Sequence, residues 1–255
     1  MTDASGKGAQ LLPKRFYKAV TVAAADSPAP PSAARGEGGA PRFRVLLDGK
    51  PVRAKRDLLL PTRALAEAVA AEWEAQGERI APASMPLTRL VNTANDGIAG
   101  GEAQVRADIV GYAGSDLLCY RTADGGELAR RQRAAWDPIL AWGAEALGAH
   151  LVVAEGIMPV AQPNAAKQAV ARALDRYGTL ALVALHVMTT LTGSALLALA
   201  HAHGRLSTDA AWAAAHVDED WQIEKWGEDS EASARRQRRW AEMQAASRLL
   251  ALLAR

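Results

Sequence analysis

The stretch TLALVALHVMTTLTGSALLALAHAH, residues 179–203, contains no Asp, Glu, Lys or Arg. It is long enough to cross a bilayer as one helix. Its threonines, its serine and His186 lower its hydrophobicity, however, and no aromatic belt flanks it. We therefore predict a central buried helix, with a single-span membrane protein through 179–203 as the alternative reading. The small residues Gly193, Ser194 and Ala195 would let neighbouring helices approach closely.

Further helices are predicted on both sides of this stretch. Glycines at 178 and 204 separate it from Pro163–Tyr177 and from Ser207–Lys225, and a last helix is expected at about Glu228–Leu253. Before them, Asp137-Pro138 is expected to divide two helices, since Asp caps a helix and Pro suits its first turn. Successive helices with short breaks are typical of a helical bundle.

The first half of the chain has a different texture. Arg15–Ala24 has the aromatic and β-branched content of a strand, and Asp48-Gly49 between Phe43–Leu47 and Lys50–Arg53 indicates a tight β-hairpin. Pro61-Thr62 is expected to start a helix that runs to Gly77. The segment 26–41 is rich in Pro, Gly, Ala and Ser and is predicted to be a mobile loop.

These patterns predict an α+β fold with a small β-rich N-terminal domain and a larger helical-bundle C-terminal domain. A flexible arm is expected over 1–14, the β-rich domain with one or two helices over 15–126, and the helical domain over 127–255. With 255 residues, of which 49% are hydrophobic, the chain can bury a sizeable core in each domain.

Charge and cysteine content restrict the possible partners. The net charge of +2 creates no global basic field, so neither nucleic acid nor stable membrane insertion is predicted. The single cysteine, Cys119, excludes an internal disulfide and a multi-cysteine zinc site. The first residues lack the charged start and apolar core of a secretory signal, and we therefore expect a cytoplasmic protein.

An acidic stretch, VDEDWQIEKWGEDSEA at 217–232, combines seven carboxylates with two tryptophans and one lysine. The carboxylates repel one another unless a partner compensates, and indoles among them gain from being covered. This composition suits a protein-recognition surface, in which Asp220 and Glu224, four residues apart, could form an acidic stripe, although periodicity alone favours a solvated helix face. Trp221 lies four residues after Val217 and could face the fold. The alternative is a solvated helix face anchored by core indoles.

No catalytic motif accompanies these acids. The sequence contains no phosphate-binding glycine loop, no strand-linked GxGxxG and no GxSxG elbow. His201 and His203 would point in different directions on a helix and could not share a metal ion. A small-molecule enzyme that uses the carboxylates of Asp218–Glu224 remains an alternative, but adjacent helical residues splay apart. We predict no catalytic residue, no metal and no cofactor.

Several segments together resemble the assembly chaperones of the ATP synthase catalytic head, which occur in mitochondria and alpha-proteobacteria. No single motif is decisive, but the matching segments follow one another in the family's order and span nearly the whole chain. They are RFYK at Arg15–Lys18, LDGKPV at Leu47–Val52, LPTRALAEAVAAEWEAQ at Leu60–Gln76, MPLTRLVNTAND at Met85–Asp96, DLLCYR at Asp116–Arg121, QRAAWDPILAW at Gln132–Trp142, GSALLALA at Gly193–Ala200 and DEDWQIEKWGED at Asp218–Asp229.

The resemblance implies a non-enzymatic protein with a β-rich N-terminal part and a helical C-terminal part. It also implies that the protein binds the unassembled ATP synthase alpha subunit at a surface later covered by beta subunits. The position matching Glu219 is expected to bind this partner, beside Asp218, Asp220, Glu224 and Trp226. Trp73 and Trp221 are expected to be structural. Relatives act in the mitochondrial matrix, and a bacterial cytoplasm is expected here.

Overall fold

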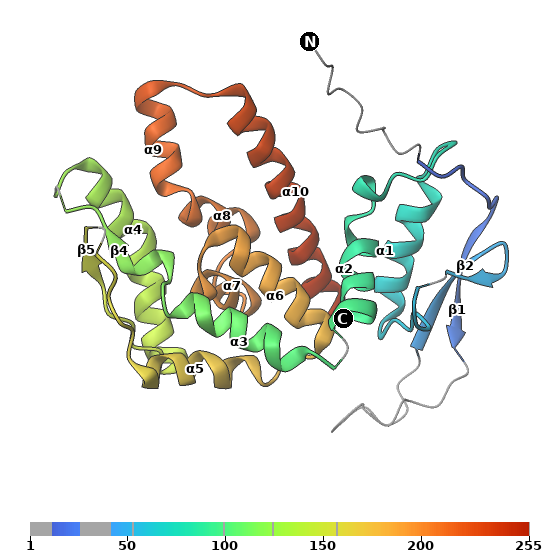
Figure 1. The fold of residues 1–255 in the computed structure, drawn as a ribbon, viewed down its shortest axis with the longest axis horizontal. Helices are drawn as coiled ribbons and strands as arrows, with labels where there is room; N and C mark the ends of the chain where they lie inside the picture. Colours follow the sequence, from blue (N-terminus) through green and yellow to red (C-terminus); the bar gives the residue numbers. More distant parts are fainter. Residues whose placement is uncertain are drawn as a thin grey trace, which may run out of the picture. The chain divides into compact units, whose positions relative to one another are not determined.

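The computed structural model describes residues 12–25, 42–52, 54–98, 100–123, 125–156 and 158–254. The predicted loop over 26–41 and residues 1–11 of the predicted arm lie outside this described part. Contacts within the chain divide it into two compact units, Met1–Arg89 and Leu90–Arg255. Figure 1 shows the strands and helices of each unit.

The first unit contains an antiparallel sheet in the order β1-β2-β3, with β1 at Val20–Ala25, β2 at Arg42–Leu47 and β3 at Lys50–Pro51. Val22 lies opposite Val45 in the register of β1 and β2. The predicted hairpin turn is confirmed, since Asp48 and Gly49 both have positive φ angles, of 48° and 79°. The first strand starts at Val20, later than Arg15, because the guanidinium of Arg15 ties its segment to main-chain carbonyls at 74 and 76.

Helix α1, Arg63–Glu74, covers the strands β1 and β2. As the sequence predicts, Thr62 caps it, and its Oγ1 accepts a hydrogen bond from the Leu65 N–H at 3.1 Å. Leu65 and Val69 are buried one helical turn apart and meet the buried face of β2. A short 3₁₀ segment, Pro82–Ser84, and helix α2, Pro86–Asn92, follow.

The second unit is mostly helical. After a π-helical segment, Thr93–Ile98, the elements are α3 Glu102–Ala113, a 3₁₀ segment Leu117–Cys119, β4 Tyr120–Arg121, α4 Glu127–Trp142, a π-helical segment Gly143–Leu147, β5 Ala154–Glu155, α5 Asn164–Leu174, α6 Thr179–Thr192, α7 Ala195–Ala202, α8 Thr208–Ala215, α9 Val217–Trp226 and α10 Ser230–Leu253. The strands β4 and β5 pair in parallel.

The charge-free stretch lies at the centre of this unit, as predicted, but it is two helices, not one. Gly193 adopts a left-handed φ of 68° and ends α6, and the Ser194 hydroxyl then accepts a hydrogen bond from the Leu197 N–H to start α7. The buried Asp116 carboxylate supports this break by accepting from the Leu196 N–H at 3.2 Å. Asp116 lies 80 residues before Leu196 in the sequence. The run of apolar residues by itself therefore predicted one helix.

The predicted division at Asp137-Pro138 is wrong, because α4 continues through Pro138. Asp137 does not cap a helix. Its carboxylate instead accepts a hydrogen bond from the guanidinium of Arg121 at 2.7 Å. Trp136 and Ile139 on either side are buried, and this packing holds the helix together across the proline.

The predicted helix Ser207–Lys225 is interrupted at His216, where α8 ends and α9 begins. The backbone of His216 lies outside the helical region, with φ −117° and ψ 19°. Its imidazole is buried, stacks on Trp212 with ring centroids 3.9 Å apart, and contacts the Trp212 carbonyl through Nδ1 at 2.7 Å. This anchoring sets the direction in which α9 leaves the bundle.

Along the chain, the first unit ends at Arg89 and the second begins at Leu90, whereas the sequence predicts a domain boundary between 126 and 127. Helix α3 accounts for the difference. Its buried residues Val105, Ile109 and Ala113 face the second unit, where α3 packs against α5, α6 and α7. A short helix between two turns carries no sequence signal for the unit in which it is buried.

The α+β class is confirmed, with a few N-terminal strands followed by a larger helical region. Within the described ranges, no helix combines the length and the apolar character required to cross a membrane. The stretch 179–203 in particular is divided between α6 and α7.

Candidate partner-binding surface

Helix α9 carries all five residues predicted to bind a partner: Asp218, Glu219, Asp220, Glu224 and Trp226. We call these five the acidic–indole surface. Three of its acids occupy the first turn of α9, where the helix dipole favours negative charge, and Lys225 lies in the last turn. No residue of α9 is buried. The helix contacts the bundle along α4.

Asp218 is the acid most closely integrated into the bundle. Its Oδ1 accepts a hydrogen bond from Nε2 of Gln132 at 2.8 Å, and the Gln132 Oε1 accepts one from the Thr122 N–H at 2.9 Å. Gln132 is buried. Asp218 thus connects the start of α9 to α4 and to the segment after β4, which gives it a structural role.

Asp220 and Glu224 are neutralised by arginines of the same chain. Arg236 of α10 lies 2.5 Å from the Asp220 carboxylate, and Arg131 of α4 lies 2.8 Å from that of Glu224. The contact with Arg131 lowers the pKa of Glu224. The predicted acidic stripe is therefore present in position, but both of its carboxylates already have cationic partners.

Glu219 differs from its neighbours. Its side chain is 37% exposed, and its carboxylate lies 3.7 Å from Nε2 of His216. Burial lowers the pKa of His216, so this imidazole is neutral near pH 7 and supplies no charge. In the described part of the chain, no Arg or Lys forms an ion pair with Glu219. Glu219 therefore keeps an uncompensated negative charge at the surface.

Trp226 ends the helix with a largely bare indole, 73% exposed. Its ring meets that of Trp221 edge to face, with centroids 5.3 Å apart. Trp221 is half-buried, and its position agrees with a supporting role. The next residue, Gly227, has a φ of 88°, which turns the chain sharply toward α10. Trp226 is thus displayed at the tip of α9.

Trp73, predicted to be structural, lies in the first unit and in no part of this surface. Its ring packs edge to face against Tyr17, with centroids 5.7 Å apart. The Tyr17 hydroxyl also donates a hydrogen bond to the Trp73 carbonyl at 2.6 Å. Trp73 thereby connects α1 to the segment before β1.

The cations that pair with α9 were not predicted to belong to the site. Arg131 belongs to a basic group, with Arg130 and Arg133, that the sequence alone suggests is a solvated helix face. The only local signal was the spacing of Glu127 and Arg131, an i,i+4 pair whose atoms lie 2.6 Å apart. Lys225 adds a second contact to Glu127 at 3.3 Å.

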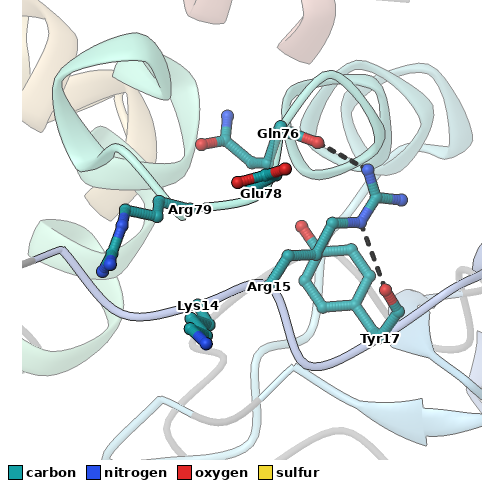
Figure 2. A pocket seen from close by; sticks show the side chains of 7 residues that line it. Lys14, Arg15, Tyr17, Gln76, Glu78 and Arg79 are labelled. Atoms are coloured by element: carbon teal, nitrogen blue, oxygen red, sulfur yellow. Dashed lines mark hydrogen bonds between the residues drawn. The ribbon is translucent and has the colours of Figure 1, made fainter.

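The two best-formed grooves in the described part of the chain do not include the acidic–indole surface. The larger, of about 660 Å³, lies in the first unit between residues 14–17 and 76–79 (Figure 2). The smaller is formed by Glu228 and the first turns of α10.

The acids of α9 do not converge as a general acid/base pair requires, because Asp218, Asp220 and Glu224 turn to three different partners. Among the described residues, no three His, Cys, Asp or Glu side chains are placed to hold a metal ion.

Residues 14–144 match the family model of the ATP12 chaperone protein. This match covers the strands β1 to β4 and the helices α1 to α4. The acidic–indole surface lies beyond it, in the part of the chain for which solved structures provide the comparison.

Three solved structures share the fold over nearly the whole chain. Atu1473 protein, a putative chaperone from Agrobacterium tumefaciens, is 48% identical with a TM-score of 0.87, over 95% of this chain and 87% of that one. Atp12 from Paracoccus denitrificans is 37% identical with a TM-score of 0.82, over 94% and 98%. An aspartate-to-lysine mutant of P. denitrificans Atp12p is 36% identical with a TM-score of 0.83, over 94% and 97%.

Proposed function

Because the chain belongs to the ATP12 chaperone family, we propose that it binds the unassembled alpha subunit of the F-type ATP synthase through the acidic–indole surface. Membership itself indicates a chaperone role in ATP synthase assembly. The alpha subunit as the partner, and the residues that meet it, are the content of the proposal.

The observation that carries the proposal is that Glu219 and Trp226 both lie on α9. Glu219 has no cationic partner within the described chain, and the Trp226 indole is 73% exposed. An uncompensated carboxylate and a bare indole both gain from being covered by a partner that offers a cation and an apolar surface. Aromatic anchors beside charged groups are typical of binding hot spots.

A chaperone must also release its client. Contacts through exposed charges accelerate association, and salt screens them, so such a surface supports binding without permanent burial. A free subunit with half of an interface exposed is prone to aggregate, and a temporary cover removes this hazard. We propose that beta subunits displace the chaperone as the hexamer forms, in the cytoplasm of a bacterial cell.

The proposal is tested by measuring the affinity of the purified alpha subunit for three variants. Glu219→Lys and Trp226→Ala are each expected to weaken binding about tenfold or more, equivalent to about 1.4 kcal/mol. Glu145→Lys reverses an exposed acid elsewhere in the second unit and is the matched control. All three should unfold at nearly the temperature of the parent, since exposed charges add little stability. An unchanged affinity in Glu219→Lys would refute the role of this surface.

A further inference from the structure

In the first unit, an isolated antiparallel bridge connects the segment Leu12–Phe16 to the segment around Arg79. Lys14 lies opposite Arg79 in an antiparallel bridge. The flanking hydrogen bonds run from the Arg15 N–H to the Glu78 carbonyl at 2.9 Å and from the Ile80 N–H to the Pro13 carbonyl at 2.8 Å. This pattern identifies Lys14 and Arg79 as a non-hydrogen-bonded pair, in which the main-chain groups of each residue point away from the other.

The main-chain N–H and C=O of Lys14 therefore point away from Arg79. No hydrogen bond connects the main chain of Lys14 or Phe16 to any other residue in the described ranges. The Leu12 carbonyl accepts a hydrogen bond from Nη1 of Arg79 at 2.5 Å, whereas the main-chain groups of Lys14 and Phe16 can pair with an additional strand.

The side chains along this edge alternate in character. Leu12 is 43% exposed and Phe16 is 71% exposed, and Lys14 lies between them in the same two-residue period. Tyr17, in the opposite phase, is buried. Lysine on an edge usually discourages pairing with another strand. Here an apolar side chain on each side of Lys14 offers contact to a complementary strand instead.

The charge around the edge is positive. Figure 2 shows Lys14 and Arg79 on the two sides of the groove, while the guanidinium of Arg15 turns away toward Gln76 and Tyr17. Arg15 is neutralised by Glu74 at 3.1 Å. Across the described residues, no carboxylate forms an ion pair with Lys14 or Arg79. Glu78 is the one acid that lines the groove.

We propose that this edge binds an extended acidic segment of a protein partner, which adds to Leu12–Phe16 as a further strand. The complementary segment has an acid opposite Lys14 and apolar residues opposite Leu12 and Phe16. In sequence, this is an apolar, any, acidic, any, apolar pattern. The edge lies in the first unit, on residues separate from the acidic–indole surface, and its occupant does not depend on the function proposed for α9.

The probe is the palindromic peptide Thr-Val-Thr-Glu-Thr-Val-Thr, which presents the same pattern in either strand direction. With the ¹⁵N-labelled full chain, the amide signals of Lys14 and Phe16 are expected to shift on titration. Replacing the glutamate of the peptide by lysine is expected to weaken binding about tenfold or more. If the lysine peptide binds equally well, or if the shifts occur elsewhere, the proposal is wrong.

Backbone methylation tests the strand pairing itself. We expect the peptide to pair antiparallel to the edge. In that arrangement the amides of the central glutamate and the two valines face the edge, because opposite residues exchange hydrogen bonds. Methylating these three amides is expected to abolish binding, whereas methylating the threonine amides should leave it nearly unchanged. Equal effects of the two modifications would exclude edge pairing.

Variants of the chain provide the matching test. Lys14→Glu and Phe16→Ser are each expected to weaken binding of the peptide about tenfold or more. The control is Lys50→Glu, which replaces an exposed cation on β3. Because Phe16 is 71% exposed, its replacement should not alter folding. Since α9 is intact in these variants, loss of peptide binding is distinguishable from failure of the proposed alpha-subunit site.

Discussion

Arg131 bridges Glu224 of α9 and Glu127 of α4, with ion-pair distances of 2.8 and 2.6 Å. One cation of the chain therefore neutralises Glu224, which belongs to the surface proposed to bind the alpha subunit. These contacts raise the pKa of Arg131 and lower the pKa of both carboxyls. The acidic–indole surface is thus partly satisfied before any partner arrives.

Removing this internal competitor should strengthen binding. We expect Arg131→Gln to bind the alpha subunit severalfold more tightly at low ionic strength, because Glu224 becomes available, and we expect the gain to disappear at high salt. Affinity measured at two salt concentrations checks this. Arg133→Gln, an exposed arginine on the same helix, is the control. Weaker binding by Arg131→Gln would mean that Arg131 itself contacts the partner.

A second prediction concerns the buried carboxyl of Asp116. Burial raises its pKa from 3.8 to about 6, although the N–H groups of Leu118 and Leu196 donate to it. The folded-state pKa lies above the unfolded value, so the folded protein binds this proton more tightly. The associated stability is fully present below about pH 4 and is lost as the pH rises to about 6. The shift corresponds to about 3 kcal/mol.

Asp116→Asn should remove this contribution, because an amide does not titrate. Relative to the parent chain, we expect the free energy of unfolding of the variant to shift upward by about 3 kcal/mol or less as the pH rises from 4 to 6, because the loss caused by Asp116 is absent. Urea denaturation at several pH values measures this difference. Asp209→Asn, an exposed acid on α8, should keep the parent's pH dependence. Identical slopes for Asp116→Asn and the parent would contradict the assignment.

A third prediction separates the structural indole from the exposed one. Trp73→Ala removes the ring that packs on Tyr17 and should destabilise the first unit by about 2–3 kcal/mol. Trp226→Ala removes a ring that is 73% exposed. It should leave thermal unfolding nearly unchanged but weaken binding of the alpha subunit. Thermal unfolding and affinity measured on both variants check the pair. A destabilised Trp226→Ala would assign that indole to the fold.

Local features of the fold were predictable because they depend on residues close together in sequence. The Asp48-Gly49 pair predicted a tight turn because these residue types tolerate the positive φ angles that the turn needs. The start of α1 was predicted from Thr62, whose hydroxyl caps an N–H three residues later. The burial of 179–203 follows from its lack of charge. The concentration of acids and indoles in the stretch 217–232 was likewise apparent from composition.

Contacts between distant residues decided the remainder. The break between α6 and α7 is supported by Asp116, which lies 80 residues before Leu196, and the pairing of Glu224 depends on Arg131, 93 residues earlier. Caps, turns and helical periodicity act within about one turn, so they specify where helices and hairpins form. Which carboxylates are neutralised and which one stays free depends on how the helices pack, because only packing brings a cation within reach of a given acid.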